Sequence, residues 1–263
     1  MLKDVVLGQY IPTNSFIHQL DPRGKIIAIG IMMVGVFLLE SVTSFALWFV
    51  WLAFLIIMTK IPPLFLIRGV KPIWFIILFT MIIHFFMTPG EVVFQLGPLT
   101  ITEEGLNRGI IIGIRIFVLV LITSMLTLTT SPLELTEGIE ALLKPFKRIG
   151  VPAHELAMMM TIALRFIPTL LEETERTMKA QMARGMDFGK GSIVQRLKNI
   201  IPLMVPLFVS AFRRADELAL AMEARCYRGG EGRTRMKQLQ FLPKDKLAIA
   251  AVVTVTAIAI IIR

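Results

Sequence analysis

Two arginines at the ends of long predicted helices have the type and spacing best suited to binding chemistry. Residues 180–185 read Ala-Gln-Met-Ala-Arg-Gly, and residues 221–226 read Ala-Met-Glu-Ala-Arg-Cys, an offset of 41 residues. Either arginine alone could simply hydrogen-bond the last carbonyls of its own helix. Two copies instead predict a pair of planar, permanently charged groups that bind acidic grooves on a partner. The candidate docking residues are Ala183, Arg184, Gly185, Ala224, Arg225 and Cys226.

Methionines gather on the first of these two helices. A flexible thioether suits a surface that repacks against several partners, and the alternative is ordinary filling of a core. We predict that these methionines contact a partner subunit: Met158, Met159, Met160, Met178 and Met182.

Groups that would carry catalysis or hold a metal are missing from the sequence pattern. His18, His84 and His154 each lack a second histidine or carboxylate at ligand spacing, and Cys226 is the only cysteine. There is no phosphate-binding Gly-x-x-x-x-Gly-Lys-[Ser/Thr] motif and no nucleophile elbow. The sequence therefore predicts a protein that is not an enzyme, with no catalytic residues, no cofactor and no metal site.

The composition indicates that part of this chain is embedded in a lipid bilayer. Of 263 residues, 55% are hydrophobic and 18% are charged, and the mean hydropathy is +0.73. This excludes a single soluble domain. The formal charge of +9 fits a basic cytosolic side better than nucleic-acid binding. We therefore expect a multi-pass protein of the cell membrane and no nucleic-acid partner.

Five apolar runs are candidates for membrane-spanning helices, each near the length that a bilayer requires. They cover residues 26–39, 42–58, 73–87, 109–128 and 247–262. Lys and Arg gather before the first run, between the second and third, and throughout residues 129–246, which carry 19 basic and 13 acidic residues. Because short cytoplasmic loops accumulate basic residues, the N-terminus is predicted inside and the C-terminus outside. A seven-span topology is the alternative, since residues 156–171 and 200–212 are also apolar.

The long internal segment is predicted to form three helices. Ser131, Pro132 and Glu134 make a capping box that starts the first, which runs to about Phe146. The second covers about residues 153–184 and the third about 192–225, with kinks expected at Pro168, Pro202 and Pro206. The domain prediction is a four-span membrane region at 1–128, a cytosolic coupling-helix region at 129–246 and a final transmembrane helix at 247–263. The fold class is all-α.

Several motifs together resemble those of the transmembrane T component of energy-coupling factor transporters, the family that includes the cobalt-transport CbiQ proteins. The similarity covers nearly the whole chain. It rests on Gly8-Gln9-Tyr10-Ile11-Pro12, Asn14-Ser15-Phe16, Asp21-Pro22-Arg23-Gly24-Lys25, Ala183-Arg184-Gly185, and Ala224-Arg225 followed by Tyr227-Arg228-Gly229. Cys226 departs from the family pattern, in which glycine is usual.

The resemblance implies a non-catalytic coupling subunit of an ATP-driven transporter. Two cytosolic ATP-binding subunits would each receive one arginine, Arg184 or Arg225, and a separate membrane-embedded S component would bind the vitamin or metal ion. Two other classes of protein are possible: an autonomous secondary transporter or channel that uses Arg115 and Arg165, and a membrane-embedded enzyme. The former would show inverted repeats with broken spans, and the latter paired carboxylates or histidines near the spans. The sequence shows neither pattern.

Overall fold

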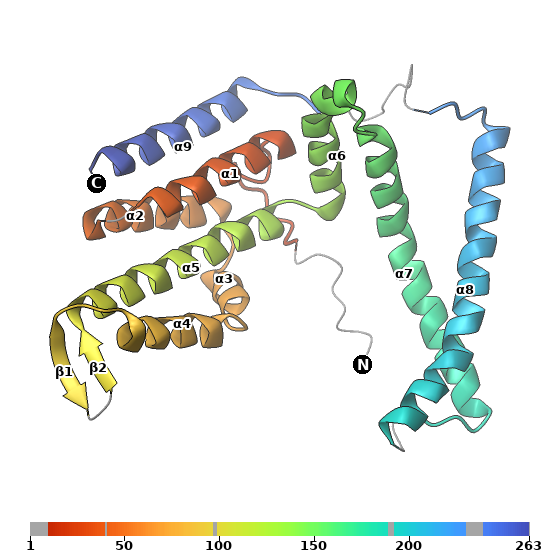
Figure 1. The fold of residues 1–263 in the computed structure, drawn as a ribbon. Helices are drawn as coiled ribbons and strands as arrows, with labels where there is room; N and C mark the ends of the chain where they lie inside the picture. Colours follow the sequence, from red (N-terminus) through yellow and green to blue (C-terminus); the bar gives the residue numbers. More distant parts are fainter. Residues whose placement is uncertain (1–9, 40, 97–98, 189–191, 230–238, 263) are drawn as a thin grey trace. The chain divides into compact units, whose positions relative to one another are not determined.

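The computed structural model describes residues 10–39, 41–96, 99–188, 192–229 and 239–262, and it is almost entirely helical (Figure 1). Gly8, Gln9 and Glu40 lie outside these residues. The elements are α1 (Pro22–Leu38), α2 (Val42–Thr59), α3 (Pro63–Val70), α4 (Trp74–Met87), β1 (Val92–Leu96), β2 (Leu99–Thr102), α5 (Glu103–Thr129), α6 (Pro132–Leu143), the 3-10 turn η1 (Lys144–Ile149), α7 (Ala153–Ala183), α8 (Ile193–Ala224) and α9 (Pro243–Ile261). The all-α prediction is confirmed, and the short β1–β2 hairpin is the one departure within the described residues.

Two compact units divide the chain. One comprises residues 8–138 with 238–263, and the other contains residues 139–237. In the first unit α1 packs against α5 and α9, and α2 also contacts α5 and α9. Its core includes the fully buried side chains Val36, Trp48, Leu52 and Ile122. These four helices contain four of the five predicted spans, and α4 contains the other.

The count of five spans is not confirmed by helix length and apolarity. Among the described residues, α5 and α7 are long and apolar enough to cross a bilayer, and α3 with α4 would form a third span if the pair, bent by 56°, counts as one. Helix α1 has 17 residues, and the first turn of α9 contains Lys244, Asp245 and Lys246, which explains why these two helices do not qualify. The apolar helix α7 lies in the segment predicted to be cytosolic.

Short polar side chains cap the start of several helices. The carboxylate of Asp21 accepts a hydrogen bond from the backbone N–H of Arg23 at the start of α1, and Thr102 does the same for Gly105 in α5. At α6, the Glu134 N–H donates to Ser131 Oγ at 3.3 Å and the Ser131 N–H donates to Glu134 Oε2 at 3.4 Å. The predicted capping box is therefore confirmed.

Three glycines bring α4 and α5 into close contact. Gly105, Gly109 and Gly113 repeat every four residues, which places them on one face of α5. A Cβ atom on Gly109 would lie 2.5 Å from the Phe85 ring, and one on Gly113 would lie 2.7 Å from the sulfur of Met81. The repeat is thus a groove that receives side chains of α4, the arrangement by which small residues bring membrane helices together.

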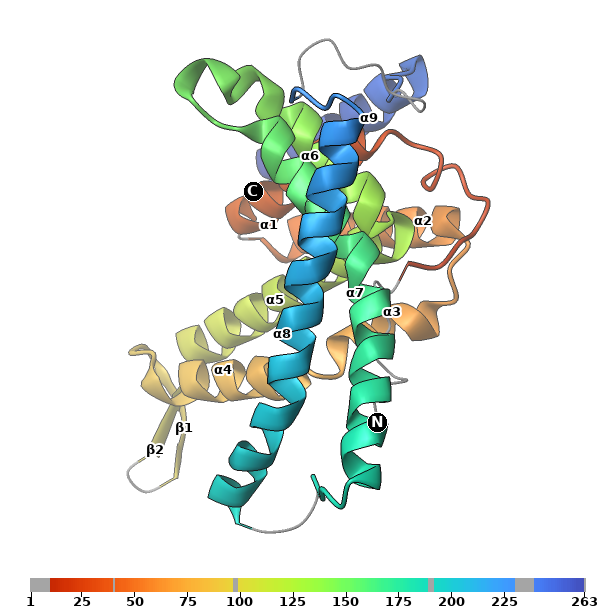
Figure 2. The same cartoon turned by 90° about the vertical axis from the view of Figure 1, so that its right-hand side faces the viewer.

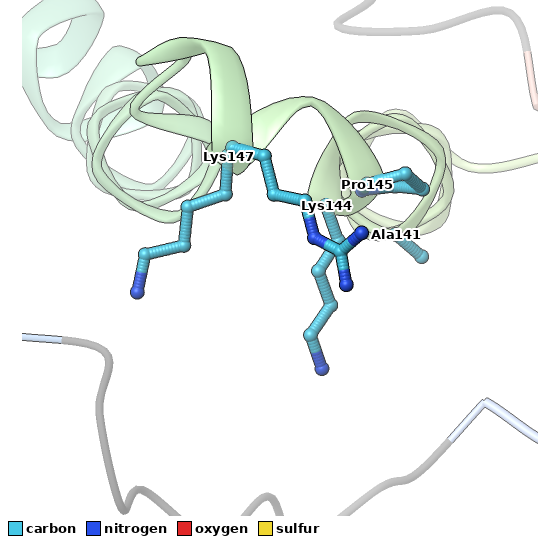
Figure 3. A pocket seen from close by; sticks show the side chains of 5 residues that line it. Ala141, Lys144, Pro145 and Lys147 are labelled. Carbon is cyan, nitrogen blue, oxygen red and sulfur yellow. The ribbon is translucent and has the colours of Figure 1, made fainter.

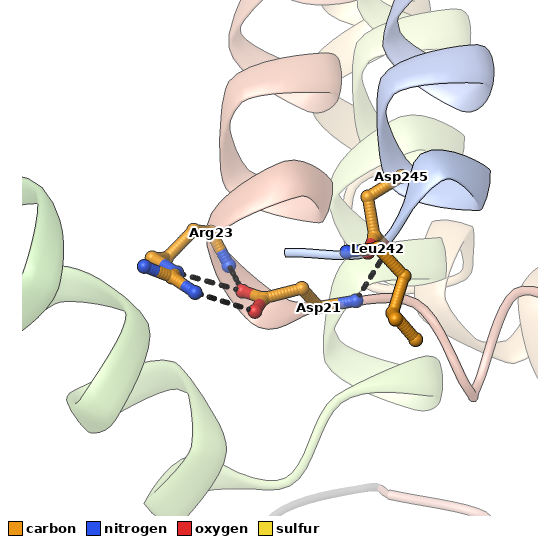
Figure 4. Close-up of polar contacts among 4 residues, drawn as sticks. All are labelled: Asp21, Arg23, Leu242 and Asp245. Carbon is orange, nitrogen blue, oxygen red and sulfur yellow. Dashed lines mark hydrogen bonds and ion pairs between the residues drawn. The ribbon is translucent and has the colours of Figure 1, made fainter. Parts of the chain in front are cut away.

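A polar cluster ties the first helix of this unit to the last (Figure 4). Asp21 receives two side-chain hydrogen bonds from Arg23, at 3.0 and 2.9 Å. The backbone N–H of Asp21 donates to Asp245 Oδ1 at 2.8 Å, and the other oxygen of Asp245 accepts from the N–H of Leu242 at 2.7 Å. Asp245 is 1% exposed. Its carboxylate therefore holds the start of α9 against the start of α1.

Lys25 extends this cluster to the end of α5. Its ammonium donates to the carbonyls of His18 at 3.1 Å and Thr129 at 3.0 Å. Lys25 precedes the predicted first span by one residue, and burial lowers its pKa to about 8, although Glu134, Asp21 and Asp245 act in the opposite direction. Lys25 thus ties the start of α1 to the end of α5, and Asp21 ties it to the start of α9.

Arg115, within the fourth predicted span, has a structural role. Its Nη2 donates to the carbonyl of Leu39 at 2.8 Å, at the C-terminal cap of α1, and its guanidinium lies over the ring of Phe37. A cation at a helix C-terminus satisfies an otherwise unpaired carbonyl. This contact explains a charged residue at membrane depth without a transport path.

Candidate functional site

Arg184 is the cap residue at the C-terminus of α7. The N–H of Met186 donates to the carbonyl of Gln181 at 3.1 Å, and the N–H of Gly185 donates to Met182 at 3.0 Å. Gly185 has φ +88°. These bonds form a Schellman ending, in which a left-handed residue directly after the cap reverses the chain and satisfies the last carbonyls. The helix therefore stops at the arginine.

The end of α8 repeats this geometry around Arg225. The N–H of Tyr227 donates to the carbonyl of Met222 at 3.0 Å, and the N–H of Cys226 donates to Glu223 at 2.8 Å. Cys226 takes the left-handed position with φ +57°. A side chain in this conformation costs roughly 1 to 2 kcal/mol that glycine avoids. Cys226 thus keeps the form of ending that Gly185 makes on α7, with added strain.

Both arginines face outward from the described parts of the chain. The structure places Ala183, Arg184 and Gly185 on the surface, and also Ala224, Arg225 and Cys226. Among the described residues, neither guanidinium has a hydrogen-bond or ion-pair partner. Within the part of the chain that the structure describes, neither arginine binds the carbonyls of its own helix; backbone N–H groups bind the carbonyls of Gln181, Met182, Met222 and Glu223 instead.

The two arginine-bearing ends lie at opposite ends of an antiparallel helix pair (Figures 1 and 2). Glu173 of α7 binds Ser210 and, at 2.9 Å, Arg214 of α8, whereas Gln181, farther along α7, binds the carbonyl of Pro202, earlier in α8. Partners that advance in one helix and retreat in the other define an antiparallel pairing. Because α7 has 31 residues, it is about 45 Å long. Arg184 and Arg225 therefore lie far apart, although the two helices that carry them are neighbours in the sequence.

His154, at the start of α7, contacts Tyr227, which lies two residues after Arg225. His154 Nδ1 lies 3.0 Å from Glu140 Oε1, and His154 Nε2 lies 3.3 Å from the hydroxyl of Tyr227. Spacing did not reveal this contact, because Glu140 lies 14 residues before His154 and Tyr227 lies 73 residues after it. His154 thus joins Glu140 of α6 to Tyr227, which follows the end of α8. No metal-binding group of His, Cys, Asp and Glu occurs among the described residues.

The five predicted methionines all lie on α7 but do not share one face. At 3.6 residues per turn, Met160, Met178 and Met182 fall within about 40° of one another, whereas Met158 points in nearly the opposite direction. Met159, Met160 and Met182 are exposed. Of the five methionines, Met160 and Met182 are both exposed and on the same face of α7, so these two remain the candidates for contact with a partner.

Comparison with known proteins assigns the chain to a family. The model of the Cobalt transport protein family matches residues 13–236. A protein of Acidaminococcus fermentans named energy-coupling factor transporter transmembrane protein EcfT is 58% identical over 247 residues, which are 94% of this chain and 92% of that protein. The protein of the same name from Bacillus subtilis is 48% identical over 264 residues and covers both chains completely. This chain therefore belongs to the family of energy-coupling factor transporter transmembrane proteins.

Proposed function

We propose that this chain couples two cytosolic ATP-binding subunits to a membrane-embedded substrate-binding S component. In this proposal, Arg184 enters a groove on one ATP-binding subunit and Arg225 enters the equivalent groove on the other. The subunits hydrolyse ATP, and α7 and α8 carry the resulting movement to the S component, which binds a vitamin or a metal ion. The chain itself is not catalytic.

The observation that carries this proposal is the repeated helix ending. Two exposed arginines stand at matching Schellman endings, and among the described residues neither guanidinium has a partner, so each can offer its full hydrogen-bonding capacity to another subunit. The approximate length of α7, about 45 Å, exceeds the width of a single side-chain groove. Separate subunits at the two ends match this spacing better than one subunit that binds both arginines.

The polar pairing of α7 with α8 supports transmission of movement. Glu173, Ser210 and Arg214 link the two helices near their middle, and the His154 contacts link the end of α8 to the start of α7. A displacement imposed at one arginine therefore reaches the other helix through charge-assisted bonds. In the proposed topology this pair is cytosolic, the N-terminus is cytosolic and the C-terminus is extracellular.

Arginine substitutions test the docking model. We expect Arg184→Ala or Arg225→Ala to weaken the binding of one ATP-binding subunit by at least about 30-fold, since loss of one member of a buried charge pair costs roughly 2 to 5 kcal/mol. The double variant should abolish uptake. Arg→Lys should also impair binding, because an ammonium cannot replace the two-pronged guanidinium. The measurements are co-purification of the subunits and ATP-dependent uptake in proteoliposomes.

Exposed arginines on the same helices provide matched controls. Arg176→Ala on α7 and Arg213→Ala on α8 remove the same side chain away from the helix ends, so both should retain assembly and uptake. Full uptake by the Arg184→Ala, Arg225→Ala double variant would refute the docking model. Uptake by this chain in liposomes without any ATP-binding subunit would instead establish an autonomous transporter.

The S component is proposed to contact the exposed apolar surface of α7 and α8. Met160 and Met182 are 44% and 47% exposed, and Phe208 and Phe212 on α8 are 57% and 68% exposed. Large exposed apolar surfaces of this kind mark sites of association. Replacing Phe212 with serine should weaken co-purification of the S component while leaving that of the ATP-binding subunits unchanged.

A further inference from the structure

An open apolar groove runs between α1 and α9, which pack side by side in the unit formed by residues 8–138 and 238–263 (Figure 1). One face of α1, from Ile27 to Leu38, forms one wall, and Thr256 and Ile260 of α9 line the other. The volume of the groove is about 490 Å³. A Cβ atom on Gly30 would meet no atom within 4 Å, so the groove is unfilled at this point.

Helices α1 and α9 run in the same direction along this groove. A Cβ atom on Gly24 would contact Asp245, and one on Gly35, eleven residues later, would contact Thr256, which follows Asp245 by eleven residues. Partners that advance together in both helices define a parallel pairing. Both helices therefore begin at the same end of the groove.

This end of the groove stands at a boundary of the bilayer. Helix α5 is long and apolar enough to cross a membrane, and the carbonyl of Thr129 at its end accepts a hydrogen bond from Lys25 Nζ of α1 at 3.0 Å. From Ile27 to Leu38 the groove extends about 16 Å along α1. One leaflet supplies about half of the ~30 Å hydrocarbon core. The groove thus matches the length of one acyl chain in its leaflet.

Two cations stand where the groove begins. Helical spacing places Lys246 on the same face of α9 as Ile260, and Arg23 on the same face of α1 as Ile27. Lys246 is exposed and forms no ion pair with any residue that the structure describes. Asp21 binds Nε and Nη2 of Arg23, which leaves Nη1 for another acceptor. The groove is therefore apolar along its length and cationic at its start.

We propose that this groove binds an anionic phospholipid, with one acyl chain between α1 and α9 and the phosphate at Lys246 and Arg23. The two carboxylates at this end, those of Asp21 and Asp245, already accept the hydrogen bonds described above. Because lipid tails are as apolar as the groove, charge supplies the affinity and the shape of the groove supplies the fit. A free phosphate would leave the groove empty. The docking of Arg184 and Arg225 is not required for this site.

The concavity beside the turn η1 differs in kind (Figure 3). It lies in the unit that contains residues 139–237 and is lined by Lys144, Lys147 and Arg148 together with Ala141 and Pro145. Lys147 already takes part in another interaction, and Ala141 and Pro145 are too few to form a long apolar wall. The combination of a cationic start and an acyl-length groove is therefore specific to α1 and α9 in this comparison.

Lipid titration of the full chain tests the cationic start of the groove. Protein in neutral detergent is titrated with phosphatidylglycerol, and bound lipid is counted by native mass spectrometry. Lys246→Gln should weaken binding about fivefold, which corresponds to the ~1 kcal/mol that a cation contributes at an anionic surface. Lys244→Gln is the matched control, because Lys244 points about 200° away around the same turn of α9. It should change the affinity less than twofold.

Filling the groove tests its apolar part. Gly30→Leu places a side chain in the groove without a clash at Cβ and should weaken phosphatidylglycerol binding severalfold. Ala53→Leu adds apolar bulk at an exposed position of α2 and should leave binding unchanged. Thermal unfolding followed by the fluorescence of the buried Trp48 checks that both variants are folded.

Equal losses in Lys246→Gln and Lys244→Gln would overturn the proposal, as would unchanged binding by folded Gly30→Leu. Wild-type protein should bind phosphatidylcholine with the same acyl chains at least fivefold more weakly, and equal binding of the two lipids would also overturn it. Displacement of the lipid by millimolar inorganic phosphate would show an anion site without the groove. If a helix of the S component fills the groove instead, Gly30→Leu should release that subunit and leave lipid binding unchanged.

The arginine variants separate this site from the docking model. Arg184→Ala and Arg225→Ala should bind phosphatidylglycerol as tightly as wild type, because neither arginine contributes to the groove. Loss of ATP-binding subunits in those variants and loss of lipid in Lys246→Gln are therefore independent results. Failure of one model leaves the other standing.

Discussion

Replacing Asp245 with asparagine should measurably destabilise the unit formed by residues 8–138 and 238–263. The carboxylate accepts backbone hydrogen bonds from Asp21 at 2.8 Å and Leu242 at 2.7 Å, and the residue is 1% exposed. An asparagine can accept only one of these bonds, and its NH₂ group then faces the other N–H. Losing one hydrogen bond to a charged group while burying an unpaired donor costs about 2 to 4 kcal/mol. For a chain of this size, that lowers the unfolding temperature by roughly 5 to 15 °C.

Intrinsic fluorescence provides the assay, because Trp48 lies fully buried in the same unit. Thermal unfolding of purified protein in detergent gives the midpoint for wild type and Asp245→Asn. Asp216→Asn, an exposed aspartate on α8, makes the same chemical change without a buried partner and should leave the midpoint unchanged. If the midpoint of Asp245→Asn lies within 1 °C of wild type, the carboxylate does not hold α9 to α1 and the reasoning fails.

Three further predictions follow from strain, packing and charge. Cys226→Gly should slow amide hydrogen exchange at the end of α8 by relieving roughly 1 kcal/mol of strain in the left-handed conformation. Gly185→Ala should speed amide hydrogen exchange at the end of α7 for the converse reason. Faster exchange in Cys226→Gly or slower exchange in Gly185→Ala would contradict the Schellman assignment. Gly109→Ala should lower the unfolding temperature by several degrees, because its Cβ would meet the Phe85 ring. Gly30→Ala should not lower it, because a Cβ there meets no atom within 4 Å. Equal effects of the two substitutions would show that close packing of Phe85 against Gly109 does not stabilise the protein. For Lys25, whose pKa is lowered by burial from 10.5 to about 8, the unfolded chain binds the extra proton between those values. The unfolding free energy should therefore rise by up to about 3 kcal/mol from pH 8 to 10.5 relative to Lys25→Met, and parallel stability curves for the two proteins would exclude this titration.

Local signals in the sequence predicted the helices and their ends. Ser131 and Glu134 gave the start of α6, and Gly185 gave the end of α7, because capping depends on residues within one turn. The arginine at each of the two helix ends could be found in the sequence because it is part of the same short local motif. The short helix α3 and the β1–β2 hairpin were not predicted, since both occupy stretches treated as loops between spans.

Contacts between distant residues required the tertiary structure. Asp245 binds the backbone of Asp21 across 224 positions, and His154 meets Tyr227 across 73, separations at which no local pattern operates. The role of the repeat of Gly105, Gly109 and Gly113 in packing became evident only from the structure, in which Phe85 and Met81 of α4 pack against it. Methionine clustering in the sequence also did not place those side chains on one face.

The sequence by itself determined that the chain is helical, enters a membrane and ends two helices on arginine, because composition, periodicity and capping are local properties. The tertiary structure decided that those arginines stand at opposite ends of an antiparallel pair and that Cys226 adopts the left-handed conformation that Gly185 has at the end of α7. The relative direction of two packed helices depends on contacts between side chains far apart in the chain. No single segment of the sequence therefore determines it.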